Sequence, residues 1–298
     1  MENSITIKSW KSWFLAARPK TLTAAFAPVI VSYFLAKQQG FNPEWTLALF
    51  ALLSSLCIQI ATNLINDALD FKKGADTDLR IGPMRVTQSK LLNSKQVFMG
   101  GLLFFALATL FAVPLIVKAG WIIALMLLIS IISGYIYTGG PYPLAYIGLG
   151  EVFVVLFFGL FSTSIFYYIQ TMEFNRFTLL AGLQIGLLCT VMIAINNLRD
   201  MEQDKKVDKK TLAVRFGERF SKFEISFLIY TPFFLSIAWI YYGLYFAALL
   251  PFTTVLFGHQ LLKYIWKTSP SPMYNTFLAF SALLHLMFSL LLCIGLIL

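Results

Sequence analysis

The chain has 298 residues, of which 58% are hydrophobic and only 12% charged, and its mean hydropathy is +0.76. Soluble domains carry about 25% charged residues, so this composition excludes an ordinary soluble fold and indicates a polytopic membrane protein. The net charge of +9 does not indicate a nucleic-acid partner, because its placement follows membrane topology. The three cysteines (Cys57, Cys189 and Cys293) stand in apolar stretches without paired spacing, and they predict neither disulfides nor a zinc site.

Apolar runs long enough to cross about 30 Å of hydrocarbon recur along the whole chain. We expect nine transmembrane helices, the first of which extends back toward Trp13. Together they predict an all-α membrane bundle that forms a single domain over residues 1–298. The expected spans are 21–36, 46–66, 97–117, 119–138, 145–170, 177–198, 223–243, 245–262 and 275–298.

The basic residues fall almost entirely on one side of this topology. Of the 23 Lys and Arg, 20 lie at the N-terminus or in the loops after the second, fourth, sixth and eighth spans. Basic loops face the cytoplasm, so we expect a cytoplasmic N-terminus and an external C-terminus. The N-terminus lacks a signal-peptide cleavage pattern, which predicts a retained first helix.

The carboxylates are scarce, 14 in the chain, and most of them lie in or near two patches. The first patch runs from Asn66 to Asp76 and the second from Asn196 to Asp204. They open two loops, 66–96 and 196–222, at the cytoplasmic ends of the second and sixth spans. Charges at the rim of so apolar a bundle indicate a function.

Helical spacing reduces each patch to a stripe of oxygen-bearing side chains. Residues four apart share a helix face, so Asn66 lies with Asp70, and Asn63 with Asp67 on a neighbouring face. Asn and Asp oxygens without His or Cys are ligands for hard cations, and Mg²⁺ prefers a few carboxylates, water and phosphate to a full protein cage. We therefore expect both patches to hold Mg²⁺ and a diphosphate, although solvated helix caps use the same residue types. The stripe in the second patch is Asn196, Asp200 and Asp204, which Asn197 can join.

Basic residues follow both patches, as a surface that clamps phosphate oxygens requires. Positive-inside topology or contact with anionic lipids accounts equally well for any single one of them. Those after the first patch are Lys72, Lys73, Arg80 and Arg85. Those after the second patch are Lys205, Lys206, Lys209, Lys210 and Arg215.

A diphosphate at the mouth of an apolar bundle indicates a lipid diphosphate substrate. Ionising its allylic C–O bond requires metal ions on the leaving group and a dry, aromatic cavity around the carbocation. Glu151 stands inside an apolar run, so it either contacts the acceptor or is a hydrogen-bonded carboxyl between helices. Aromatic candidates around the loop between the fourth and fifth spans are Tyr135, Tyr137, Tyr142 and Tyr146.

Four segments resemble the UbiA superfamily of intramembrane aromatic prenyltransferases, and most closely its menaquinone branch, the 1,4-dihydroxy-2-naphthoate polyprenyltransferases. Gly74 stands where hydroxybenzoate transferases tend to have an acid, and Gly82-Pro83 replaces their Arg-Thr-x-x-Arg-Pro run, which favours a naphthoate acceptor. The last three spans match only as hydrophobic helices. The resembling segments are 17–22, 66–83, 137–151 and 196–217.

The resemblance implies an Mg²⁺-dependent enzyme of a bacterial inner membrane, with its active site facing the cytoplasm. It would transfer a polyprenyl group from polyprenyl diphosphate to 1,4-dihydroxy-2-naphthoate, release diphosphate and CO₂, and give demethylmenaquinone. The expected metal-binding residues are Asn66, Asp67, Asp70, Asp76, Asp200 and Asp204. The expected catalytic residues are Asp70, Arg80, Glu151, Asp200, Lys210 and Arg215. The expected substrate-binding residues are Arg18, Asn63, Lys73, Tyr137, Tyr142 and Asn197.

Three other functions fit parts of the same pattern. Another aromatic acceptor, 4-hydroxybenzoate or a phylloquinone precursor, would use the same kind of site. A cation-coupled secondary transporter also carries paired acids, but near the membrane midplane, whereas these acids lie at one rim. A lipid-phosphate binder without turnover would need the same charged surface.

Overall fold

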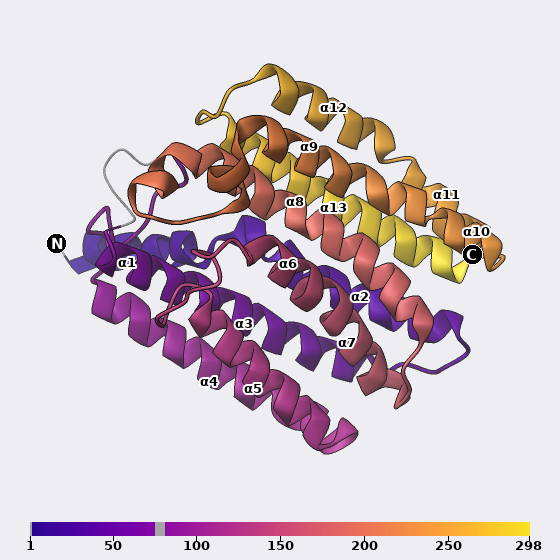
Figure 1. Cartoon of the computed structure of the whole chain (residues 1–298). Coiled ribbons are helices and arrows are strands. Elements are labelled where there is room, and N and C mark those ends of the chain that lie inside the picture. Colours follow the sequence, from indigo (N-terminus) through magenta and orange to yellow (C-terminus); the bar gives the residue numbers. More distant parts are fainter. Residues whose placement is uncertain (1, 75–80) are drawn as a thin grey trace.

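The computed structural model describes residues 2–74 and 81–298, and these residues form helices without a strand. The helices run side by side in one bundle (Figure 1). In chain order they are α1 (Glu2–Ala17), η1 (Pro19–Thr21), α2 (Thr23–Gln38), α3 (Trp45–Lys72), α4 (Ser94–Ala119), α5 (Trp121–Ile136), α6 (Gly150–Val154), η2 (Val155–Phe161), α7 (Ser162–Thr171), α8 (Arg176–Lys206), α9 (Leu212–Leu235), α10 (Ile237–Tyr241), α11 (Tyr245–Phe252), α12 (Val255–Lys267) and α13 (Tyr274–Ile297).

The long helix α8 is the most buried span of the bundle. It packs against the π-helical segment η2 with almost no side chains between the two backbones. A Cβ atom added to Gly159 of η2 would lie 2.4 Å from the carbonyl oxygen of Gly182 on α8. Close approach through small residues is how helices associate where lipid removes the hydrophobic driving force.

A buried amide ties α8 to α9 and α10. Gln184 is fully buried, and its Nε2 donates to the carbonyl of Pro232 at 2.8 Å and to the hydroxyl of Ser236 at 3.1 Å. The indole nitrogen of Trp239 donates to the Gln184 Oε1 at 2.7 Å. Because the amide uses both its donor and its acceptor, we interpret Gln184 as a packing residue rather than part of a functional site.

The predicted spans are recovered as helices, but their number is not confirmed. Among the described residues, seven helical stretches are long and apolar enough to cross a membrane. An eighth is added if Trp10–Thr21 and Thr23–Gln38, which meet at 51°, form one bent span. The helix α5 has 16 residues and falls short of the length expected of a span. The count of nine therefore stays a prediction.

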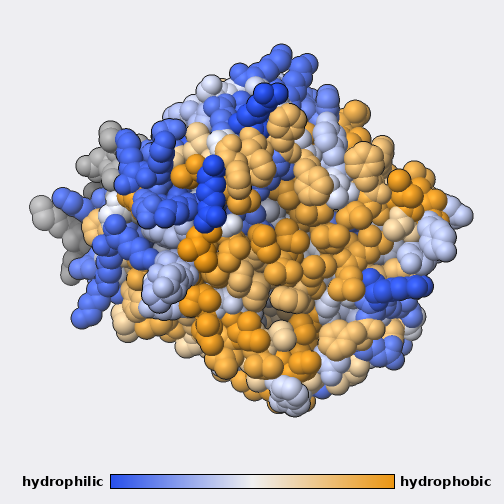
Figure 2. All heavy atoms as spheres, viewed as in Figure 1, coloured by the Kyte–Doolittle hydropathy of each residue, from blue (hydrophilic) through white to orange (hydrophobic). Residues whose placement is uncertain are grey.

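The loops that follow α3, α5 and α8 gather at the end of the bundle where the N-terminus lies, and the C-terminus lies at the other end (Figure 1). Both acidic patches thus meet at one end, as their positions in the sequence predict. Hydrophobic side chains cover the middle of the face seen in Figure 2, and hydrophilic ones gather toward the ends. This distribution is that of an integral membrane protein.

Candidate active site

The helix α3 carries the first acidic patch into the bundle because it stays helical up to Lys72. Asn66 accepts a hydrogen bond from the hydroxyl of Thr138 at 2.6 Å, which ties α3 to the loop after α5. Asn63 donates to the carbonyl of Ala17 at 3.0 Å and to the Thr21 hydroxyl at 3.1 Å. Asn63 therefore fixes the turn between α1 and α2, and this turn places Arg18 at the site.

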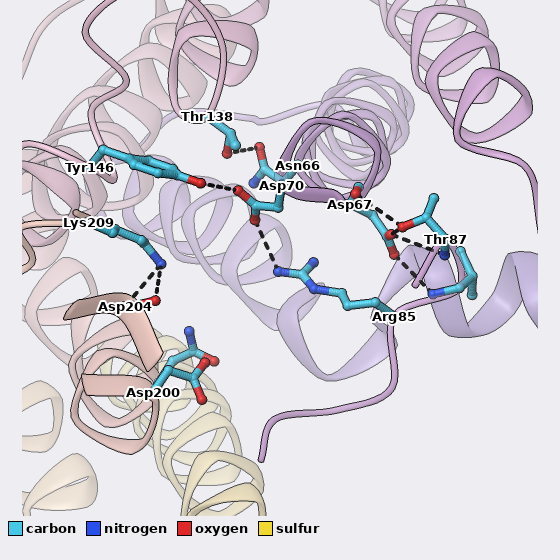
Figure 3. A network of polar contacts seen from close by, with 12 residues as sticks. Asn66, Asp67, Asp70, Arg85, Thr87, Thr138, Tyr146, Asp200, Asp204 and Lys209 are labelled. Carbon is cyan, nitrogen blue, oxygen red and sulfur yellow. Dashed lines mark hydrogen bonds and ion pairs between the residues drawn. The ribbon is translucent and has the colours of Figure 1, made fainter. Parts of the chain in front are cut away.

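Asp70 lies at the centre of the first patch (Figure 3). Its Oδ1 accepts from the Tyr146 hydroxyl at 3.0 Å, and its Oδ2 forms an ion pair with the Arg85 Nη2 at 3.4 Å. The side chain of Asp70 is 13% exposed, so it borders a cavity that solvent can reach. A carboxylate in this position is available to a cation.

Asp67 points away from this group, and the structure does not bring it together with the other expected metal ligands (Figure 3). It is buried, and its carboxylate accepts from the backbone N–H groups of Val86 and Thr87 at 3.3 and 3.4 Å and from the Thr87 hydroxyl. These bonds hold the loop that precedes α4 and thereby set the position of Arg85. Helical spacing could not predict this role, because the donors that bind the Asp67 carboxylate belong to residues about 20 positions further along the chain.

The second patch lies at the end of α8. Asp200 is held by the neighbouring Arg199, whose Nε and Nη2 donate to its two oxygens at 2.8 and 2.7 Å. Asp204, one turn further on, forms an ion pair with the Lys209 Nζ at 3.2 Å. Asn196 accepts from Arg199 at 2.6 Å. The expected stripe of Asn196, Asp200 and Asp204 is therefore present on one helix.

Lys209 is the cation that lies between the two patches (Figure 3). Burial alone would lower the pKa of its ammonium group, but the carboxylates of Asp204, Asp70 and Asp200 outweigh burial and raise that pKa. Its Nζ also lies 5.9 Å from the ring centre of Tyr146, whose hydroxyl binds Asp70. Lys209 thus stays charged and joins both acidic groups electrostatically.

The loop after α5 contributes polar and aromatic groups to the same place. Lys73 donates to the carbonyl of Thr138 and lies 4.6 Å from the ring centre of Tyr146, on which it stacks. Burial lowers the pKa of Lys73, and the charge of Asp70 partly opposes that shift. Tyr137 lines the cavity, whereas Tyr142 is 78% exposed and lies outside it.

Glu151 is buried at the start of α6. Its Oε1 accepts from the Asn197 Nδ2 at 2.7 Å, and its Oε2 is buried without a hydrogen-bond partner. Asn197 lines the cavity between the two patches. The pair therefore joins α6 to α8 and leaves one carboxyl oxygen with unused hydrogen-bonding capacity beside the cavity.

Lys210 and Arg215 do not reach the cavity. The Lys210 Nζ pairs with Asp208 at 3.3 Å on an exposed surface. Arg215 donates through Nη2 to the carbonyl of Ile147 at 2.9 Å and through Nε to the carbonyl of Lys210 at 3.0 Å. The loop can lie this close because Gly148 has no side chain, since a Cβ there would sit 2.7 Å from the Lys210 carbonyl oxygen. Arg215 braces two loops, and Lys209 takes the place that the sequence predicts for these residues.

Two expected residues, Asp76 and Arg80, lie outside the described residues. Conversely, the structure brings in four groups beyond the expected set. They are Arg85, Thr138, Tyr146 and Lys209. Sequence position had singled out Arg85, Tyr146 and Lys209 only as members of basic or aromatic groups.

The polar groups surround a cavity of about 210 Å³ between the ends of α3 and α8. A second cavity of about 300 Å³ adjoins it between α3, α5 and η2, and its lining is mostly apolar. Phe153, Phe157 and Phe161 form an aromatic ladder along its wall, with ring centres 4.5 and 5.5 Å apart. The residues shared by the two cavities are Ala24, Thr62, Tyr137, Val154 and Phe158. A cavity with charged groups thus adjoins an apolar one.

The donor set suits a hard divalent cation held loosely. Asp70, Asp200 and Asp204 supply oxygen ligands, and each of them is already paired with one basic side chain, so a cation fits here together with an anion that those basic side chains can balance. Across residues 2–74 and 81–298, no three His, Cys, Asp or Glu side chains converge into a ready-made metal cage. Mg²⁺ fits such an open site, because it keeps several waters and takes few protein ligands together with substrate phosphate.

Comparison with known proteins shows which family the chain belongs to. The model of the UbiA prenyltransferase family matches residues 25–294. The 1,4-dihydroxy-2-naphthoate octaprenyltransferase of Haemophilus influenzae is 36% identical over 217 residues, which cover 70% of each chain. The enzyme of the same name from Bacillus subtilis is 38% identical over 204 residues, 68% of this chain and 65% of the relative. A UbiA homolog from Archaeoglobus fulgidus, solved with DMAPP and Mg²⁺, shares the fold with a TM-score of 0.61 at 18% identity, over 94% of this chain and 99% of that one.

Proposed function

Because this chain belongs to the UbiA prenyltransferase family, we propose that it transfers a polyprenyl group from polyprenyl diphosphate to 1,4-dihydroxy-2-naphthoate. Diphosphate and CO₂ are released, and because the transfer is redox-neutral its direct product is the quinol, demethylmenaquinol, which becomes demethylmenaquinone only after a separate two-electron oxidation. The naphthoate acceptor is supported by the relatives, which carry that activity in their names at 36% and 38% identity. The transfer chemistry is supported by the two adjoining cavities, one with charged groups and one apolar.

The diphosphate of the donor fits the cavity with charged groups. Asn66, Asp70, Asp200 and Asp204 would hold Mg²⁺, which would neutralise the diphosphate and stabilise the charge that develops on it as a leaving group. Lys209, Arg85 and Arg18 border the same space and would bind the phosphate oxygens directly. Each basic side chain that now balances a carboxylate can then balance phosphate instead.

The polyprenyl tail fits the apolar cavity. The cavity beside α5 and η2 presents aromatic and aliphatic side chains to it, and it buries the tail away from water. When the allylic C–O bond breaks, the electron pair leaves with diphosphate, and the carbocation remains among aromatic faces. Exclusion of water from this space prevents hydrolysis of the cation.

The acceptor fits the junction of the two cavities. Tyr137 lines both cavities, Asn197 lines the charged one, and the buried Glu151 is bonded to Asn197. We propose that this pair orients the ring hydroxyl of the acceptor, with the Oε2 of Glu151 as hydrogen-bond acceptor. A new carbon–carbon bond then joins the ring to the allylic carbon, and the ring carboxylate departs as CO₂.

The proposed location is the inner membrane of a bacterium, with the charged cavity facing the cytoplasm. The charged loops, the N-terminus and the proposed diphosphate site lie at one end of the bundle (Figure 1). Positive-inside topology places that end in the cytoplasm, where water-soluble 1,4-dihydroxy-2-naphthoate and Mg²⁺ are available.

The direct test is prenyl transfer by purified protein in detergent. The donor is octaprenyl diphosphate with Mg²⁺, and equal amounts of 1,4-dihydroxy-2-naphthoate and 4-hydroxybenzoate compete as acceptors. We expect mass spectrometry to detect the prenylated, decarboxylated naphthalene product in large excess. Prenylated 4-hydroxybenzoate as the main product would assign a different acceptor, and the absence of any prenylated product would refute the proposal.

A further inference from the structure

The last helix, α13, contributes a polar residue to this site, although it carries no acidic residue. Asn275 is the second residue of α13, and its Oδ1 accepts from the Arg199 Nη1 at 2.7 Å. Its Nδ2 donates to the carbonyl of Ile81 at 3.1 Å. One side chain therefore contacts the residue that holds Asp200 and the loop that follows the first patch.

Arg199 is fully buried, so its guanidinium depends on fixed partners. Its Nε and Nη2 contact the two oxygens of Asp200, Nη2 also contacts Asn196, and Nη1 contacts Asn275. A planar guanidinium presents its donors in a rigid fork, so the bond at Nη1 sets the plane in which the other donors meet Asp200. The orientation of Asp200 is thereby coupled to the position of Asn275.

Arg199 uses only part of the hydrogen-bonding capacity of Asp200. A carboxylate offers about four lone-pair positions, and the fork of Arg199 occupies one on each oxygen. The direction of the other lone-pair positions of Asp200 therefore depends on the plane that its carboxylate shares with the Arg199 guanidinium. If Arg199 turned to seek another acceptor, Asp200 would turn with it.

Asn275 itself is held in place by its neighbour. Tyr274 is fully buried, and its hydroxyl donates to the carbonyl of Thr268 at 2.9 Å. The centres of the Tyr274 and Phe277 rings lie 5.2 Å apart, so the two rings pack together. The first turn of α13 is therefore rigid, and Asn275 can transmit a defined position to Arg199.

We propose that Asn275 is a positioning residue that orients Asp200 through Arg199 and ties the loop at Ile81 to the second acidic patch. The inference rests on the proposed role of Asp200 as a metal ligand. Groups that orient metal ligands typically change metal affinity or activity by about 10–100-fold when they are replaced. We therefore expect Asn275 to act on metal affinity rather than on the fold as a whole.

The test is binding of Mn²⁺, as a substitute for Mg²⁺, to the full chain in detergent with inorganic diphosphate, measured by electron paramagnetic resonance without turnover. Asn275→Leu keeps the approximate volume and removes both hydrogen bonds, and we expect it to weaken Mn²⁺ binding about tenfold or more. Thr276→Ala, at the exposed next position, should bind as the parent does. Binding by Asn275→Leu as tight as by the parent would overturn the inference.

Two further variants separate positioning from folding. Gln184→Leu removes buried hydrogen bonds that involve neither Arg199 nor Asn275, and we expect Mn²⁺ affinity to be kept even if thermal stability falls; a loss as large as that of Asn275→Leu would mark a structural effect and overturn the inference. Asn275→Asp keeps an acceptor for Arg199, and we expect affinity closer to the parent than in Asn275→Leu; equal weakening would overturn the route through Arg199. A parent that binds no Mn²⁺ would overturn the metal site itself, and this inference with it.

Discussion

Replacing Asp67 with alanine should destabilise the protein far more than the same change at Asp70, although both lie at the end of α3. The Asp67 carboxylate is buried and accepts from two backbone N–H groups and the Thr87 hydroxyl. Alanine leaves the two backbone N–H groups without an acceptor, whereas the Thr87 hydroxyl keeps its bond to the backbone carbonyl of residue 67 at 3.2 Å. Each buried donor without an acceptor costs about 1–3 kcal/mol. Because the loop can relax and admit water, we expect a net loss of about 3 kcal/mol rather than the full sum.

The change at Asp70 should have the opposite profile. Its side chain and Arg85 both line the cavity, where water can replace the lost partner, and their ion pair at 3.4 Å is long, so its loss should cost less stability than the loss of Asp67. Prenyl transfer should fall about 100-fold or more, since a group that stabilises developing charge is removed. The two variants thus separate a structural acid from a proposed metal ligand.

The assay combines heating with turnover. Detergent-solubilised variants are heated, the folded fraction is measured by size-exclusion chromatography, and transfer rates are expressed per folded protein. We expect Asp67→Ala to lower the apparent melting temperature by roughly 5–10 °C and to retain activity at low temperature. An Asp67→Ala variant that melts like the parent but lacks activity would refute the structural role, and normal turnover by Asp70→Ala would move the site elsewhere.

Four other changes probe the remaining parts of the account. Glu151→Gln keeps an acceptor for Asn197 but should lower the turnover number about 100-fold with little change in the KM of the prenyl donor; a turnover number near that of the parent would make Glu151 a purely interhelical group. Lys209→Met should raise the KM for prenyl diphosphate about tenfold, whereas Lys210→Met, on the exposed surface, should leave it unchanged; equal KM values for the two variants would contradict the placement of Lys209. Met126→Trp fills part of the apolar cavity and should reduce kcat/KM for octaprenyl diphosphate more than for geranyl diphosphate, with Met99→Trp on an exposed face of α4 as the control; an equal loss with both donors would argue against a tail site there. EDTA should stop product formation and Mg²⁺ should restore it, and full turnover in EDTA would exclude a metal-dependent mechanism.

Much of the site could be predicted from local spacing. Asn66, Asp70, Asp200 and Asp204 lie where α3 and α8 end, because both helices run unbroken through their patches and keep residues four apart on one face. Charge placement also predicted that the two patches meet at one end of the bundle. These features depend on helical periodicity and topology, which the chain carries locally.

Contacts between distant segments could not be predicted in this way. Asp67 shares the helix end with Asp70 but turns toward Thr87, and no periodicity shows which partner a carboxylate finds. Lys209 and Lys210 are neighbours in the sequence, yet only Lys209 pairs with Asp204. Helical spacing does not predict this difference, because α8 ends at Lys206 and both lysines lie in the turn beyond it. Asn275 lies 76 residues from Arg199, in a span that carries no acidic or basic motif. The number of spans depends on the bend before α2 and on the short α5, and hydropathy alone does not decide either.

The most direct measurement is a structure of the protein with Mg²⁺ and an unreactive thiolodiphosphate analogue of its prenyl donor. We predict that the diphosphate lies between Asp70 and Asp204, near Lys209, and that the tail extends past Tyr137 along Phe157. A diphosphate bound away from the two acidic patches, or a tail that leaves the apolar cavity empty, would contradict the account.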